Sequence, residues 1–153
     1  MNTQPRFTAQ AVQQHLARLA SVFLQRYAAG DRTFSKAVFN NGRLQVVAPN
    51  LSYVNFSHQT LSRISLAGGI LEHACLQACD LSYSDLSKVN LRSANLQQAN
   101  LSYVNLSGAD LTGANLAGAD LANANLQGAK VSVAALQSAV LFETVLPDGR
   151  VSG

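Results

Sequence analysis

The sequence has no tryptophan and only two cysteines, three prolines and one methionine among its 153 residues. Two cysteines, Cys75 and Cys79, are too few for a disulfide framework, which excludes the small disulfide-stapled folds of secreted proteins and fits a reducing compartment. No apolar run approaches the roughly 18 residues of a membrane-spanning helix. The opening residues also lack the basic and apolar segments of an export signal. We therefore expect a cytoplasmic protein.

Charged residues are also scarce, at 12% of the chain, and they are unevenly placed. Residues 1–36 hold five basic side chains against one acidic side chain, whereas residues 37–153 hold six basic and seven acidic ones. The basic balance therefore belongs to the N-terminal arm, and the rest of the chain is nearly neutral. Because the long body has no excess of positive charge, we expect neither nucleic acid nor a membrane as a partner.

The residues between Thr8 and Gly30 predict one amphipathic helix. Five apolar side chains recur at spacings of three and four, as they do on one face of a helix: Val12, Leu16, Leu19, Phe23 and Tyr27. Thr8 is a suitable N-cap and Gly30 a suitable C-terminal stop. We expect this helix to cover the open end of the structure that follows. Binding to an anionic membrane surface or to a partner's helix are the alternatives.

What the sequence has in abundance is a five-residue repeat. From Leu51 to Leu146 an apolar residue returns at every fifth position, twenty times in succession, and it is leucine eighteen times. In a straight helix this spacing places successive leucines about 140° apart, and in a straight strand it places them on opposite faces. A chain that bends once per unit brings them all to one interior. The repeat therefore predicts a solenoid of stacked coils.

Each unit has two positions that we expect to point inward. They are the leucine and the residue two before it, which is alanine in ten of the twenty units. The residue just before the leucine is Asn or Asp in twelve units, and we expect it to face solvent. The spacing starts earlier, at Phe34, Phe39 and Leu44, and is then broken by two extra residues near Pro49. We expect a bulge or loop there.

Units such as ANLQQ, ADLTG, ANLAG and ADLAN follow the pattern A(D/N)LxG and resemble the pentapeptide-repeat family over residues 34–146. The stretches RYAAGDRTF and LPDG also resemble members from oxygenic photosynthetic bacteria. The resemblance implies an all-β solenoid, a right-handed four-sided (quadrilateral) β-helix of about five to six coils with four units in each. We expect three segments: an N-terminal arm and capping helix at 1–30, the β-helix at 31–146 and a tail at 147–153.

In such a β-helix, residues twenty apart lie above one another. Arg63, Tyr83 and Tyr103 then form one row, in which the guanidinium and the two rings can stack. Two ionic pairs also follow from the spacing, Glu72 over Arg92 and Asp110 over Lys130. The tyrosine row is either an internal ladder or a contact surface for another protein.

The last coil departs from the polar pattern. Val140 and Val145 stand where Asn or Asp is usual, and Val133 and Phe142 occupy other outward positions. An exposed apolar patch at the end of a solenoid invites association. Three outcomes are open: the tail folds back as a plug, the patch joins two copies into a homodimer, or a different protein binds it.

We find no pattern that indicates a catalytic, cofactor or metal site. His73, Cys75 and Cys79 have a ligand-like spacing, but Cys79 is at an inward position and Cys75 at an outward one, so they should not converge. The sequence favours a non-catalytic interaction or scaffold module with an unidentified protein partner. The family resemblance offers an alternative, a DNA-mimicking inhibitor or protector of a type II topoisomerase (gyrase). Such mimicry needs rows of carboxylates, whereas Asn outnumbers Asp here.

Overall fold

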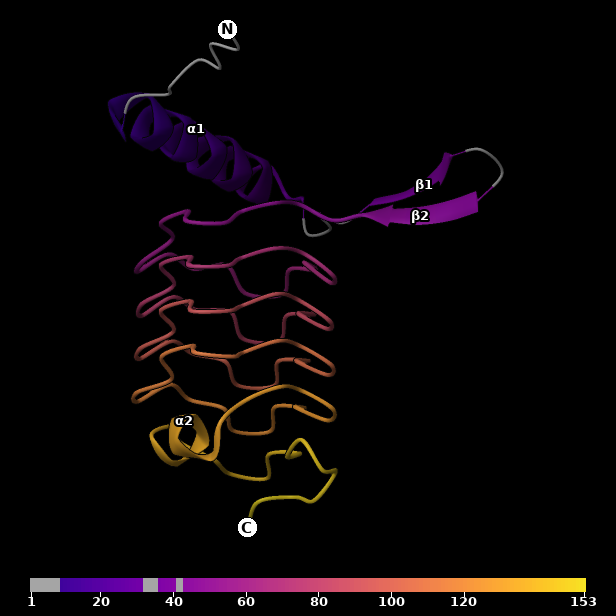
Figure 1. Cartoon of the computed structure of the whole chain (residues 1–153), viewed down its shortest axis with the longest axis vertical. Helices are drawn as coiled ribbons and strands as arrows, with labels where there is room; N and C mark the ends of the chain where they lie inside the picture. Colours follow the sequence, from indigo (N-terminus) through magenta and orange to yellow (C-terminus); the bar gives the residue numbers. More distant parts are fainter. Residues whose placement is uncertain (1–8, 32–35, 41–42) are drawn as a thin grey trace, which may run out of the picture.

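The computed structural model describes residues 9–31, 36–40 and 43–153. Helix α1 (Ala9–Ala28) lies across one end of a stack of coils, and the short helix α2 (Val133–Gln137) lies at the other end (Figure 1). Strands β1 (Lys36–Asn40) and β2 (Arg43–Val47) form a hairpin that extends sideways between α1 and the first coil (Figure 1). The stack therefore has two differently covered ends.

The coils are joined by parallel β-bridges between residues twenty apart, from the pair Asn50 and Ile70 to the pair Asn125 and Val145. The N–H of the leucine, or of Phe56, donates to a carbonyl in the following coil in every unit from Leu51 to Leu126 except at Leu116, as in the 2.8 Å bond from Leu91 N to Asp110 O. Four units therefore make one coil, and the ladder spans just under five coils. The predicted solenoid of stacked coils with four units in each is confirmed by this ladder.

The bend that the repeat requires is a tight turn after each leucine. The leucine carbonyl accepts the N–H three residues later, as in the 3.1 Å bond from Ala94 N to Leu91 O. In every unit from Leu51 to Leu126, the second residue after the leucine has a positive φ between 51° and 73°. A four-residue turn in which only the third residue has a positive φ is typically a type II turn. Glycine fits it without strain at Gly108, Gly113 and Gly118.

The core is the stack of inward side chains. The leucines from Leu51 to Leu126, with Phe56, are at most 4% exposed, and most residues two places earlier are also buried. Both inward positions of the unit are thus confirmed, Gln59 being exposed as one exception. Farther along, Val131, Leu136 and Leu141 are only partly buried because no further coil covers them. The core is therefore closed at the α1 end and partly open at the C-terminal end.

Helix α1 covers the first coil, as the spacing of its apolar residues predicts. Phe23 is buried, and its ring centroid lies 4.9 Å from that of Phe56 in the first coil. The hydroxyl of Tyr27 donates a 3.1 Å hydrogen bond to the carbonyl of Ser62. Val12, in contrast, is 44% exposed. The capping role is therefore carried by the helix from Leu16 onward.

The helix ends where Gly30 was expected to stop it. Gly30 has φ of 99°, and its N–H donates to Tyr27 O at 3.0 Å. The N–H of Asp31 donates to Arg26 O at 3.0 Å, so the two bonds form a Schellman motif. Arg26 Nε also bonds Asp31 Oδ2 at 2.8 Å. The predicted N-cap, Thr8, lies outside the described residues.

Two local predictions about the coils are wrong. Phe39 and Leu44 do not start a further coil but face each other across the antiparallel β1–β2 pair; Phe34 lies outside the described residues. The two residues between the strands are Asn41 and Gly42, the dipeptide with the strongest preference for a two-residue hairpin connection. The β-ladder accordingly begins at Asn50, and there is no sixth coil in the described chain.

The second difference is α2, which replaces the regular turn near the end of the solenoid. Ser132 caps it, its hydroxyl oxygen accepting the N–H of Ala135 at 3.1 Å. The sequence here is SVAALQS, which has a serine N-cap followed by good helix formers and no Asn or Asp before the leucine. The chain therefore winds into one helical turn in place of a bent extended unit.

Candidate functional site

The polar rows on the coil faces build the turns. In all twelve units with Asn or Asp before the leucine, the side-chain Oδ1 accepts the backbone N–H two residues later. The bond from Ser102 N to Asn100 Oδ1 is 3.1 Å. Short Asx side chains favour this local bond. The sequence pattern predicted that these residues lie on the outside, but it did not reveal their hydrogen bonds. The signal that could have found them is the recurrence of Asn or Asp directly before the leucine.

Arg63, Tyr83 and Tyr103 form the stack that their spacing predicts. The two tyrosine ring centroids are 4.7 Å apart with an interplanar angle of 3°, and the guanidinium carbon of Arg63 lies 4.7 Å from the Tyr83 ring centroid. Tyr53 and His73 form a similar pair, 4.8 Å apart and 9° from parallel. The same twenty-residue spacing could have found this second pair. Both stacks join neighbouring coils, and their three tyrosines are more than half exposed.

One arginine on the coil faces pairs with two carboxylates. Arg92 lies 3.9 Å from Glu72, as expected, and 3.4 Å from Asp110. Asp110 and Lys130 are bridged through their backbones, but the carboxylate of Asp110 bonds Arg92 and Thr112. Hydrogen bonds from the hydroxyl and N–H of Thr112, and then the Arg92 charge, lower the pKa of Asp110. The expected ionic pair with Lys130 is therefore replaced by one with Arg92.

The two cysteines are placed on opposite sides of the coil wall, as expected. Cys79 is fully buried, and this burial raises the pKa of its thiol to about 12. Cys75 is half-buried on the outside, where its Sγ lies 2.9 Å from Ser57 Oγ. Among the described residues there is no group of three or more His, Cys, Asp or Glu side chains that could hold a metal ion. A buried, protonated Cys79 cannot act as a nucleophile.

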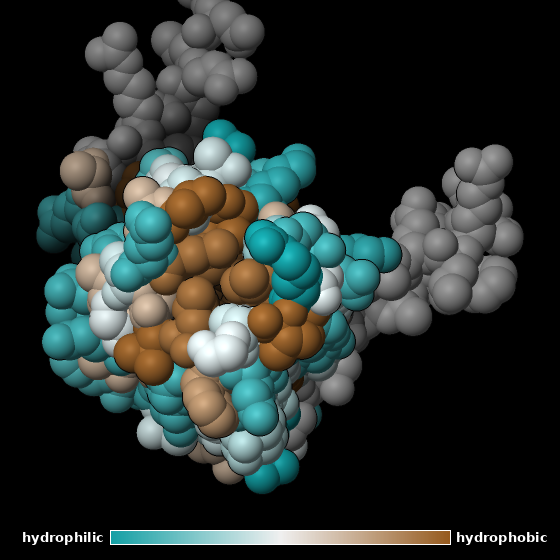
Figure 2. Space-filling model, turned by 90° about the horizontal axis from the view of Figure 1, so that it is seen from below, coloured by the Kyte–Doolittle hydropathy of each residue, from teal (hydrophilic) through white to brown (hydrophobic). Residues whose placement is uncertain are grey.

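The C-terminal end of the stack carries an apolar surface. Viewed from below, brown hydrophobic residues fill the middle of this end (Figure 2). Val133 is 70% exposed, Val140 55% and Phe142 56%, and Leu136 and Leu141 in the same last coil are only partly buried. We call this surface the end patch.

The tail folds back over one side of this end. Leu146 N donates to Arg150 O at 2.7 Å, and Ser152 N donates to Thr144 O at 2.9 Å. Val145 is half-buried and forms an antiparallel bridge with Val151. The tail thus covers the side that holds Val145, and the end patch stays uncovered beside it. Of the predicted patch residues, Val145 alone is shielded in this way.

Comparison with known proteins identifies the repeat. The family model described as pentapeptide repeats matches the chain in eight copies, over residues 50–87, 74–113 and 99–134. These ranges together cover more than half of the sequence. The chain belongs to the pentapeptide-repeat family. No match was found among curated protein sequences.

Several solved structures resemble this pentapeptide-repeat protein. The pentapeptide-repeat protein Rfr23 from the cyanobacterium Cyanothece 51142 is 26% identical, with a TM-score of 0.54, over 63% of this chain and 76% of that one. A pentapeptide-repeat protein from Nostoc PCC 7120 is 26% identical, with a TM-score of 0.45, over 78% and 92%. QnrB1, a plasmid-mediated fluoroquinolone resistance protein, is 23% identical, with a TM-score of 0.48, over 62% and 52%.

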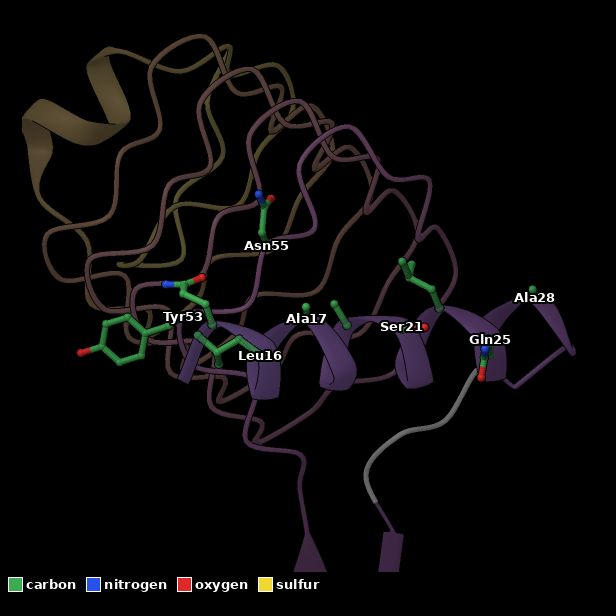
Figure 3. A pocket seen from close by; sticks show the side chains of 10 residues that line it. Leu16, Ala17, Ser21, Gln25, Ala28, Tyr53 and Asn55 are labelled. Atoms are coloured by element: carbon green, nitrogen blue, oxygen red, sulfur yellow. The ribbon is translucent and has the colours of Figure 1, made fainter. Parts of the chain in front are cut away.

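The opposite, N-terminal end of this pentapeptide-repeat chain has a cleft beside α1. It has a volume of about 620 Å³ and is lined by α1 and by the first coil at Tyr53 and Asn55 (Figure 3). The cleft was missed at the sequence level because it depends on how α1 lies on the coil, which no spacing in the sequence encodes. The described helices include none that is both long and apolar enough to cross a membrane.

Proposed function

We propose that this pentapeptide-repeat chain is a non-catalytic protein-interaction module whose end patch binds a second copy of itself. The observation that carries the proposal is the exposure of Val133, Val140 and Phe142 over a core that no further coil covers. On the coil faces, by contrast, the Asn and Asp side chains are used in turns, and Arg92 pairs with Glu72 and Asp110. The end patch is therefore the apolar surface best suited to a protein partner.

The backbone at this end also favours pairing with another chain. In the regular coils, the leucine N–H donates to the coil that follows, except at Leu116, whose partner unit is α2. Among the described residues, no hydrogen bond is found for the N–H of Leu141, which lies between Val140 and Phe142 in the sequence. An unpaired N–H beside exposed apolar side chains is a typical site of edge-to-edge association.

The charges around the end patch permit a symmetric pair. Lys130 and Glu143 are exposed there, and Arg150 Nε bonds Asp148 Oδ2 at 2.6 Å. These four charges cancel. A two-fold interface brings the same surface of two copies together, so it must be self-complementary. A neutral apolar end meets that requirement without like-charge repulsion. Burying the exposed halves of Val140 and Phe142 in both copies would contribute roughly 3 to 6 kcal/mol.

Light scattering coupled to gel filtration tests the proposal. The wild type should have twice the 16.2 kDa mass of one chain. The double variant Val140→Asn, Phe142→Asn should have the mass of one chain. Val22→Asn is the matched control, because Val22 is 55% exposed on α1, as Val140 is at the end patch. The control should remain dimeric. A monomeric wild type, or a double variant that remains dimeric, contradicts the proposal.

The local use of carboxylates favours this function over imitation of DNA. Asp110 is paired with Arg92, and Asp85 Oδ1 accepts a bond from Asn105 Nδ2 at 3.1 Å. The rows hold eight Asn and only four Asp, so they carry few negative charges, whereas duplex DNA presents a dense and regular array of them. A gyrase supercoiling assay with micromolar protein should show no inhibition. Clear inhibition would favour the topoisomerase-directed alternative.

A further inference from the structure

The cleft beside α1 joins an apolar helix wall to an open backbone edge. Five of its helix residues are alanine or leucine, and none of its ten lining residues is charged. Tyr53 stands at one end of the cleft, fixed by its stack on His73, and Asn55 lies above the helix (Figure 3). The five helix residues are Leu16, Ala17, Ala20, Leu24 and Ala28.

The coil side of the cleft presents backbone N–H and C=O groups whose equivalents in the second coil are hydrogen-bonded. In the second coil, Cys75 N donates to Val54 O at 2.9 Å, and Cys75 O accepts from Phe56 N at 2.8 Å. Asn55 occupies the equivalent place in the first coil, which has no coil before it. Among the described residues, no hydrogen bond is found for the backbone N–H or C=O of Asn55, or for the C=O of Ser57.

Helix α1 seals a different side of the same coil. The hydroxyl of Tyr27 donates to the carbonyl of Ser62, which would otherwise be open, and Phe23 covers Phe56. The nearest strands of the chain, β1 and β2, pair with each other. The edge at Asn55 is therefore left with one donor and two acceptors, which an extended chain can match with its own C=O and N–H groups.

We propose that this cleft binds an extended, uncharged segment of another protein, which adds a strand to the edge at Asn55. The segment would accept the N–H of Asn55, donate to the carbonyls of Asn55 and Ser57, and place apolar side chains against Leu16 and Leu24. Backbone pairing gives affinity in this mode, and the apolar wall selects side chains. The inference deepens the proposed protein-binding function and uses the end opposite to the end patch.

Selection from a phage library of random linear nonapeptides tests this. The wild-type chain should enrich uncharged peptides, and a synthetic copy of an enriched peptide is then titrated into each variant. Ala17→Trp fills the cleft from an exposed position and should weaken binding at least about tenfold. Val22→Trp, also exposed but outside the cleft, should bind as the wild type does. No enrichment, or equal binding to Ala17→Trp, overturns the proposal.

Amide hydrogen exchange supplies a readout that does not depend on the variants. In the free protein the Asn55 amide should exchange quickly, whereas the Cys75 amide, bonded to Val54, should be protected. Saturating peptide should slow exchange at Asn55 specifically; unchanged exchange there overturns the proposal even if the peptide binds. The Val140→Asn, Phe142→Asn variant should still bind peptide. If this variant loses the dimer but still binds the peptide, the two sites act independently, so each proposal can fail without the other.

Discussion

Replacing Asn125 by alanine removes one side-chain acceptor from the turn-forming row while leaving the β-ladder in place. Asn125 Oδ1 accepts the N–H of Gln127 at 2.9 Å. The backbone bonds of Asn125, to Val104 O and from Leu106 N, do not involve its side chain. The substitution therefore tests whether the Asx bond stabilises a coil or merely accompanies it.

The expected magnitude follows from the surroundings of this bond. Loss of a comparable side-chain cap at a helix N-terminus destabilises by about 1 kcal/mol. Gln127 is exposed, so water can replace part of the lost bond. We expect Asn125→Ala to lower the free energy of unfolding by about 0.5 to 1 kcal/mol.

A matched aspartate keeps the acceptor. In the same row, Asn125 is bridged to Asn105 and Val145, neither of which is charged. Asn125→Asp should therefore be nearly as stable as the wild type. Asn100 differs because it is bridged to Asp80 and Asp120. Asn100→Asp would stack three carboxylates about 4.8 Å apart, and we expect it to be destabilising at low salt.

Urea unfolding followed by circular dichroism measures these differences. All variants should be compared at one protein concentration, because association shifts apparent stability. Equal stability of Asn125→Ala and Asn125→Asp would refute the reasoning, since only the alanine lacks the acceptor. An Asn100→Asp variant whose stability does not recover with added salt would contradict the assigned repulsion.

Three further predictions concern the core, the pH dependence and thiol reactivity. Leu101 is fully buried, so Leu101→Asp should cost more than about 4 kcal/mol and abolish the cooperative urea transition at 25 °C. The hydrogen bonds from Thr112 favour the ionised form of Asp110 in the folded state, so they stabilise the fold at pH values above the ordinary pKa of an aspartate. This stabilisation is lost as the pH falls through the lowered pKa of Asp110. The Asp110→Asn variant should therefore lose less stability than the wild type between pH 7 and about pH 3. Because burial raises the pKa of Cys79 to about 12, iodoacetamide at about pH 8 should label Cys75 in the native protein and Cys79 only after unfolding, as mass spectrometry can show.

The repeated part of the fold could be predicted because one local rule is applied many times. A leucine at every fifth position permits one kind of interior, so the coil and its buried rows follow from spacing alone. The twenty-residue coil then places Tyr83 over Tyr103 without further information. The open C-terminal end followed too, since Val140 and Phe142 stand where the pattern requires polar residues.

The ends of the solenoid could be predicted less well because the rule stops there. The hairpin signal at Asn41 and Gly42 competes with the leucine-like spacing of Phe39 and Leu44, and hairpin pairing forms. The serine cap and helix formers near α2 override the turn of one unit. The cleft at Asn55 arises from the position of α1 over the first coil, a tertiary contact that neither segment specifies by itself.

Small-angle X-ray scattering of the wild-type protein tests most directly whether two copies join at their end patches. Pairing through Val140 and Phe142 places two stacks end to end. It predicts a particle with twice the mass and about twice the length of the Val140→Asn, Phe142→Asn variant, and with the same cross-section. A wild type with the mass of one chain, or a dimer that is thicker but no longer, would contradict the proposed pairing.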